Sequence, residues 1–130
     1  MAEDYSGAER RQHERVKVNF TVVYQVDKPL EFSMMIGNKL VDALMLDLSE
    51  SGMSVLTTYN LPIGAELLIK FTLIGAHPYY ESRSVSMNVT GEVRNNIIFK
   101  REERRLGVLF TKISEQDRGI LVGFVQKIHQ

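Results

Sequence analysis

The sequence predicts a mainly β fold, a six-stranded antiparallel barrel with one C-terminal α-helix, and two observations support this prediction. Short segments of alternating apolar and polar residues recur along the chain and are separated by turn sequences, as in small barrels. Helical periodicity, in contrast, is confined to the residues after Ser114. A chain of 130 residues, 44% of them hydrophobic, is long and apolar enough for one domain with its own core.

The first half of the chain contains three predicted strands. Residues 16–26 alternate between apolar and mostly polar side chains, with many β-branched and aromatic residues, and Asp27-Lys28-Pro29 ends the pattern. Residues 40–48 form a short, mostly apolar segment that suits a second strand. Ser49-Glu50-Ser51-Gly52 has the composition of a turn, and residues 53–58 are the returning third strand.

The second half contains the other three strands. Residues 67–73 follow a turn at Leu61-Pro62-Ile63-Gly64 and alternate again. Residues 85–93 have the cleanest alternation in the chain, which Arg94-Asn95-Asn96 interrupts. Residues 106–110 are predicted to be the last, short strand.

The C-terminal segment is predicted to be an amphipathic helix. Ser114 is a suitable N-cap, and Asp117 lies in the first turn. One apolar stripe follows, formed by Ile120, Leu121, Phe124, Val125 and Ile128. This stripe could pack on the barrel or, as readily, serve a homodimer.

The N-terminal residues 1–15 are predicted to be a flexible arm ahead of the barrel and helix of residues 16–130. They hold few large apolar side chains and several charged ones, so they cannot bury enough surface to order themselves.

Charge and composition exclude several classes of protein. The 16 Lys and Arg residues balance the 16 Asp and Glu residues, which argues against nucleic-acid binding through a large basic excess. The absence of cysteine excludes disulfides, thiolate nucleophiles and Cys-ligated zinc. No apolar run approaches the ~20 residues of a membrane span, and the first residues are not a secretory signal, so we expect a cytoplasmic protein without membrane insertion.

Two short motifs carry binding chemistry. The first is Arg11-Gln12-His13-Glu14-Arg15, with Arg10 directly before it; arginine forks bind phosphate and stack on purines. The second runs from Asp47 to Gly52 and places a carboxylate, a hydroxyl and a flexible glycine at a strand end, where Gly52 would allow a positive φ and close approach of the backbone to a ligand. Taken alone, the first could be a solvated surface cluster and the second an ordinary turn of a hairpin.

Together, an RxxxR arm before the first strand and DxSxxG after the second resemble the PilZ domain family, bacterial receptors for the second messenger cyclic di-GMP. The resemblance extends from about residue 10 to residue 128 and includes Gly91-Glu92-Val93-Arg94 and the segment from Arg105 to Phe110, which resemble the late strands of the family. It implies a PilZ-like barrel that binds cyclic di-GMP and needs no cofactor or metal. The ligand-binding residues implied are Arg10, Arg11, Arg15, Asp47, Ser49 and Gly52.

The resemblance also implies roles and departures. Arg11 and Arg15 would wrap the nucleotide, and Arg10 goes in the family with binding of an intercalated pair of cyclic di-GMP molecules instead of one. The spacing between the two motifs indicates an insertion at about residues 27–39, whose Met34-Met35-Ile36 is either an apolar contact patch or a hairpin tip. No tryptophan is available to stack on a guanine.

The predicted function is therefore a non-enzymatic cyclic di-GMP receptor that orders its arm on binding and signals through protein contacts, for example with motility or exopolysaccharide machinery. The alternative is a PilZ-fold adaptor that binds protein partners without nucleotide. The three histidines have no ligand-like spacing, and Glu102-Glu103 suits a charged hairpin tip better than an acid pair for catalysis. A small-barrel nucleic-acid binder and a hydrolase have less support in the sequence.

Overall fold

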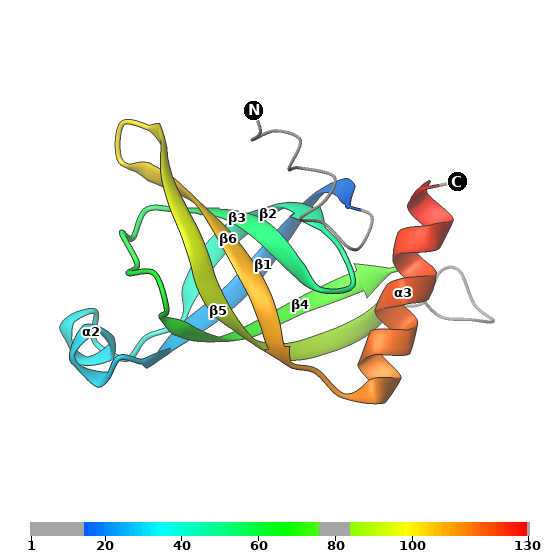
Figure 1. Ribbon diagram of the computed structural model, residues 1–130, viewed down its shortest axis with the longest axis horizontal. Coiled ribbons are helices and arrows are strands. Elements are labelled where there is room, and N and C mark those ends of the chain that lie inside the picture. The colour runs from blue at the N-terminus through cyan, green and yellow to red at the C-terminus, as the bar shows by residue number, and fades with distance from the viewer. Residues whose placement is uncertain (1–14, 76–83, 130) are drawn as a thin grey trace, which may run out of the picture.

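The computed structural model describes residues 15–75 and 84–129, which contain six strands and two helices (Figure 1). The elements in chain order are β1 (Val16–Lys28), α2 (Leu30–Met35), β2 (Val41–Leu48), β3 (Gly52–Thr57), β4 (Glu66–Ile74), β5 (Ser84–Lys100), β6 (Glu103–Lys112) and α3 (Glu115–His129). The predicted arm, except for Arg15, and residues 76–83 between β4 and β5 lie outside the described residues.

The six strands form a closed barrel in the order β1-β2-β3-β6-β5-β4. Every neighbouring pair is antiparallel, including the β1–β4 pair that closes the barrel. The predicted fold class, an antiparallel six-stranded barrel with a C-terminal helix, is confirmed.

The core lies inside the barrel and is built from the inward side of each strand. Strict alternation in β4 and in the first half of β5 places every second residue inside, as the sequence pattern predicts. Tyr24 is one of the largest fully buried side chains, and its hydroxyl shares a 2.7 Å hydrogen bond with the hydroxyl of Thr57. This bond gives the buried Tyr24 hydroxyl a partner in the core, and Oγ1 of Thr57 also accepts the backbone N–H of Tyr59 at 3.4 Å.

Helix α3 packs on the barrel through part of its predicted stripe. Leu121, Phe124 and Val125 are buried, and the ring of Phe124 lies 6.0 Å from that of Phe20 on β1. The cap is as predicted, because the backbone N–H of Asp117 donates to Oγ of Ser114 at 3.0 Å. Ile128, the last residue of the predicted stripe, is 49% exposed near the end of the helix.

Strand β5 is longer than predicted. Arg94-Asn95-Asn96 does not interrupt it, since the β5–β6 ladder absorbs the irregularity as a register shift between Val93 and Asn95 and continues to Lys100. The side-chain amide of Asn96 donates to Oδ1 of Asn60 and to the carbonyl of Leu61. It therefore bonds to the segment before β4 and not to the β5–β6 ladder. Both strands reach the tip at residues 101–102, where the sequence predicts a charged hairpin tip.

The insertion predicted near residues 27–39 contains a short helix that the sequence does not reveal. Helix α2 follows Pro29, whose carbonyl accepts the N–H groups of Phe32 and Ser33. Ser33 is its one buried residue, while Met34 and Met35 are exposed. The two methionines are therefore exposed on the connection between β1 and β2, and an apolar contact patch at this segment stays a prediction.

No helix in the described part of the chain is long and apolar enough to cross a membrane.

Candidate functional site

A β-bulge sets the direction of Asp47. Val41, Ala43 and Met45 of β2 point into the barrel, and strict alternation would send Asp47 inside as well. The register with β3 shifts between Met45 and Asp47, which adds one residue to β2 at this point. The shift leaves Asp47 on the outer face and returns Leu48 to the core.

The carboxylate of Asp47 is held by two arginines from distant parts of the chain. Arg15, directly before β1, donates from Nη1 to Oδ1 of Asp47 at 2.6 Å. Arg105 of β6 donates from Nη2 to Oδ2 at 3.2 Å. Since each carboxylate oxygen has its own guanidinium partner, the two bonds fix the rotation of the side chain as well as its position.

Arg105 reaches Asp47 across β3, which lies between β2 and β6 in the barrel. Asp47 is paired with Ser54 of β3, and Arg105 with Leu56, two residues farther along the same strand. These four residues therefore share the outer face. The small side chain of Ser54, 7% exposed, leaves room for the guanidinium to cross and lies at the bottom of the site.

Ser49 organises the turn between β2 and β3. Its Oγ accepts the backbone N–H groups of Ser51 and Gly52, each at 3.2 Å, and its own N–H donates to the carbonyl of Gly52 at 2.9 Å. The residue is 1% exposed, and its hydroxyl is engaged within the turn. The alternative of an ordinary serine turn is therefore what the geometry shows here, and contact of Ser49 with a ligand stays a prediction.

Gly52 is required by the barrel itself. A Cβ at this position would lie 2.2 Å from the carbonyl oxygen of Val108 in β6, much closer than any side chain allows. The prediction of a positive φ at Gly52 is wrong, since the residue continues into the β3 strand. The backbone of Gly52 closely approaches the neighbouring strand β6.

The site presents one shielded anion between two accessible cations. The side chain of Asp47 is 13% exposed, against 27% for Arg15 and 44% for Arg105. Guanidinium forks match the oxygens of a phosphate, and a carboxylate accepts two adjacent N–H donors such as those of a guanine edge. The arrangement can therefore bind a ligand that carries both groups.

The described structure brings together Arg15, Asp47, Ser49 and Gly52 of the predicted site, while Arg10 and Arg11 lie outside the described residues. Arg105 is not among the site residues predicted from the sequence, which names it only as the first residue of the segment that resembles a late strand of the family. Its contact with Asp47 follows from β3 lying between β2 and β6, and only a strand order could have indicated it. Within residues 15–75 and 84–129, no cluster of His, Asp and Glu is placed to hold a metal ion.

Comparison with protein families and curated proteins gives one match. The model of the PilZ domain matches residues 9–127 of the chain. No curated protein matches the sequence.

Several solved structures share the fold. The inhibitor of motility MotI/DgrA of Bacillus subtilis has a TM-score of 0.70 at 19% identity, and the alignment covers 91% of this chain and 50% of that one. The PilZ domain of YcgR from Escherichia coli, solved with c-di-GMP, has a TM-score of 0.60 at 14% identity and 92% coverage of both chains. The PlzA protein of Borreliella burgdorferi, in complex with c-di-GMP, has a TM-score of 0.59 at 15% identity, covering 95% of this chain and 44% of that one. The chain thus spans about half the length of the first of these proteins.

Proposed function

The chain belongs to the PilZ domain family, and we propose that it is a non-enzymatic receptor for cyclic di-GMP. Two proteins that share its fold were solved with this nucleotide, YcgR and PlzA. We place the receptor in the bacterial cytoplasm and its output in contacts with protein partners, for example of motility or exopolysaccharide machinery.

The observation that carries the proposal is the shared carboxylate of Asp47. Arg15 is the second arginine of the RxxxR motif, and Asp47 begins the second motif, 32 residues away in the sequence. Their 2.6 Å bond joins the two motifs on one surface, which is what a single ligand-binding site requires. Arg105 adds a second guanidinium to the same surface.

We propose that binding exchanges the partner of Arg15. The nucleotide carries two phosphates, and a phosphate would replace Asp47 as the acceptor for the Arg15 guanidinium. Asp47 would then accept the adjacent N–H donors of a guanine, while Arg105 keeps the second carboxylate oxygen. Arg10 and Arg11 would close over the ligand from the preceding segment and create a new surface for a partner.

A second candidate function is that of an adaptor that binds proteins without nucleotide. The observation in its favour is that both oxygens of Asp47 have arginine partners within the protein itself. In this case the two ion pairs would be structural, and cyclic di-GMP would not bind.

Isothermal titration calorimetry of the full chain with cyclic di-GMP, cyclic di-AMP and GTP decides between the two. If the chain is a receptor, cyclic di-GMP gives a saturable heat of binding, whereas cyclic di-AMP and GTP give none. Absence of heat at tens of micromolar protein would reject the receptor and leave the adaptor.

Variants then test the site. Arg15→Ala and Asp47→Ala should each weaken binding by about 10- to 100-fold, because each removes a charge-assisted hydrogen bond worth ~1.5–3 kcal/mol. Lys28→Ala is the matched control, since it removes a cation and its ion pair with Glu66 from the opposite end of β1. Equal affinities for Lys28→Ala and Arg15→Ala would contradict the assignment.

Stoichiometry tests the role of Arg10. If Arg10 supports an intercalated pair, the wild-type chain binds two molecules of cyclic di-GMP and Arg10→Ala binds one. A single molecule per chain in both proteins would reject the pair.

A further inference from the structure

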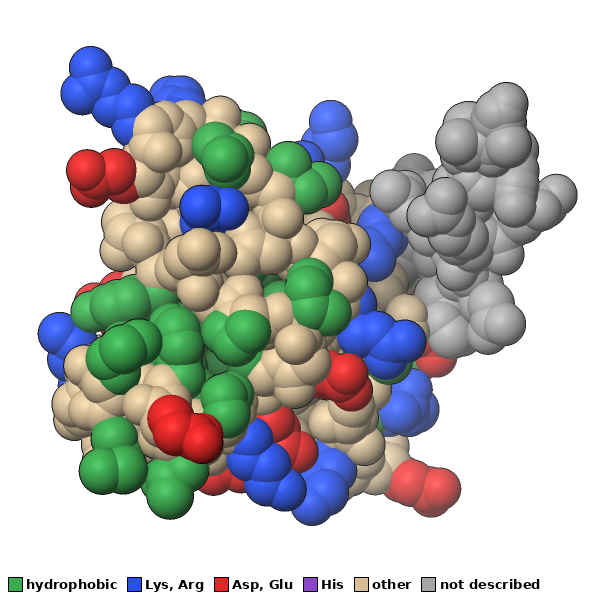
Figure 2. Space-filling view, turned by 60° about the vertical axis from the view of Figure 1, so that its left-hand side comes forward, with side chains coloured by type: hydrophobic (Ala, Val, Ile, Leu, Met, Phe, Trp, Pro, Cys, Tyr) green, Lys and Arg blue, Asp and Glu red, His purple; other side chains and the backbone are tan. Residues whose placement is uncertain are grey.

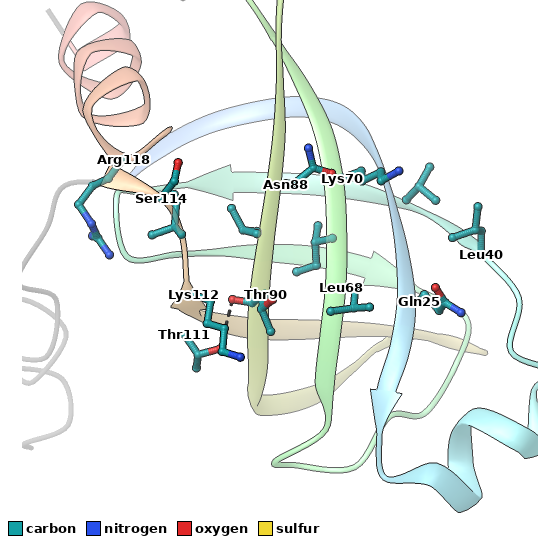
Figure 3. A pocket seen from close by; sticks show the side chains of 14 residues that line it. Gln25, Leu40, Leu68, Lys70, Asn88, Thr90, Thr111, Lys112, Ser114 and Arg118 are labelled. Carbon is teal, nitrogen blue, oxygen red and sulfur yellow. Dashed lines mark hydrogen bonds between the residues drawn. The ribbon is translucent and has the colours of Figure 1, made fainter. Parts of the chain in front are cut away.

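A groove of about 720 Å³ lies on the outer face of the barrel (Figure 3). Its floor is formed by β1, β4 and β5, whereas Asp47 and Arg105 lie on β2 and β6. The end of β6 and the first turn of α3 form the wall at one end, where Figure 3 shows Ser114 and Arg118. The groove and the proposed nucleotide site are therefore separate surfaces.

One end of the groove is apolar. Leu40 and Leu68 lie on either side of Gln25 and are 65% and 42% exposed (Figure 3). Helix α2, which precedes Leu40 in the chain, exposes Met34 and Met35, and Figure 2 shows hydrophobic side chains gathered on one face of the molecule. Exposed, contiguous apolar side chains with flexible methionines are typical of protein-binding surfaces.

The other end and one rim of the groove are cationic. Lys112 and Arg118 lie at the α3 end, and Lys70 projects from β4 (Figure 3). None of the lining residues carries a carboxylate, and the ion pairs found among the described residues include none of these three cations. Arg118 donates to the backbone carbonyl of Glu50 at 3.3 Å, which is a neutral acceptor.

The dimensions of the groove fit a short peptide segment. It crosses from β1 over β4 and β5 to the end of β6, three inter-strand spacings or about 14 Å. An extended chain of about four to six residues covers this distance. Three separated cations beside apolar side chains are too few for a nucleic-acid backbone, which needs a longer basic track.

We propose that the groove docks a segment of a partner protein that places apolar side chains on Leu40 and Leu68 and carboxylates on Lys112, Arg118 and Lys70. The occupant is an acidic peptide segment with leucine-like residues at one end. Its docking does not require the nucleotide, so the proposal stands or falls separately from the receptor function.

A hexapeptide array tests the chemistry of the occupant. Each position carries Leu, Ser, Glu or Lys, and the array is probed with the labelled full chain without nucleotide. The expected result is selection of peptides that combine Leu at one end with Glu at the other. Selection of Lys-rich peptides, or no selection, would overturn the proposal.

Amide NMR shifts and variants then locate the best Leu/Glu peptide on the protein. Shifts are expected at Leu68, Lys70 and Lys112, and Lys112→Glu should weaken binding about tenfold by placing like charges together. Lys100→Glu, at the tip of the β5–β6 hairpin, is the matched control and should bind as the wild type does. Shifts elsewhere, or equal affinities of the two variants, would overturn the assignment.

Sedimentation of the full chain examines the remaining occupant, a second copy of the protein. If a partner segment occupies the groove, Lys112→Glu should leave the sedimentation of the peptide-free chain unchanged. A wild-type dimer that Lys112→Glu dissociates would show that the occupant is a second copy of the chain, and this result would overturn the proposal.

Discussion

Two arginines bond to the carboxylate of Asp47, and they differ in where they lie in the fold. Arg15 stands at the start of β1, at the end of the RxxxR segment, while Arg105 is fixed within the β6 ladder. We propose that a ligand displaces Arg15 from Asp47, whereas Arg105 stays with the barrel. In this account Arg105 keeps Asp47 oriented in both the free and the bound protein.

Arg105→Ala tests this division of roles. Loss of the Arg105 bond leaves the carboxylate of Asp47 free to rotate, so the affinity for cyclic di-GMP should fall by about three- to tenfold, less than for Arg15→Ala. Calorimetry measures the difference. Arg104→Ala, the neighbouring substitution on β6, is the control and should leave the affinity unchanged; a larger loss with Arg105→Ala than with Arg15→Ala would contradict the division.

Tyr24 gives the core a pH-dependent contribution to stability. Burial raises the pKa of Tyr24 to about 12 from 10.0, against the opposing effect of the hydrogen bond with Thr57. Because the folded protein favours the neutral phenol, this contribution is complete below pH 10 and is lost as the pH rises toward 12.

Tyr24→Phe should therefore lower the free energy of unfolding by about 1 kcal/mol at neutral pH, since it removes the buried hydrogen bond between Tyr24 and Thr57. The same variant should show a smaller decline of stability above pH 10 than the wild type does. Urea unfolding at a series of pH values measures both effects, and identical slopes in the two proteins would contradict the assignment to Tyr24.

At the scale of elements, β3 packs closely against β6. This packing holds the turn between β2 and β3, with its DxSxxG motif, against the barrel. Gly52 has no space for a Cβ, because the nearest atom is the backbone carbonyl oxygen of Val108 and cannot rotate away. The glycine of the DxSxxG motif is thus explained by strand packing, and the serine by the turn that the Ser49 hydroxyl closes.

Gly52→Ala should destabilise the protein by about 1–3 kcal/mol, because β3 and β6 must separate to admit the new methyl group. Gly119→Ala is the matched control. A Cβ there meets no atom within 4 Å on helix α3, so the same substitution should stabilise by about 0.5–1 kcal/mol. Urea unfolding of both variants provides the comparison, and equal signs of the two effects would argue against the packing account.

The elements also show where sequence patterns are informative. The strands with strict alternation and the capped helix were predictable, since each pattern is local and repeats several times. Helix α2 was not, because six residues hold too few turns for a periodic pattern. The bulge before Asp47 was not predictable either, as it is defined by pairing with a strand that the local sequence does not specify.

At the scale of the whole molecule, the barrel brings together residues that the sequence separates. The resemblance of both motifs to one family assigns Arg15 and Asp47 to one ligand-binding site, but it indicates neither their ion pair nor the contribution of Arg105. The contact of Arg105 depends on the strand order β2-β3-β6 and therefore on the closed barrel. The same closure separates the Asp47 surface from the groove on β1, β4 and β5.

The central claim is that cyclic di-GMP binds on the Asp47 surface, and an amide NMR titration of the full chain tests it most directly. The account predicts saturable shifts centred on Arg15, the Asp47–Gly52 segment and Arg105, with unchanged signals for Lys70 and Asn88 in the groove. The absence of saturable shifts, or shifts centred on the groove, would contradict it.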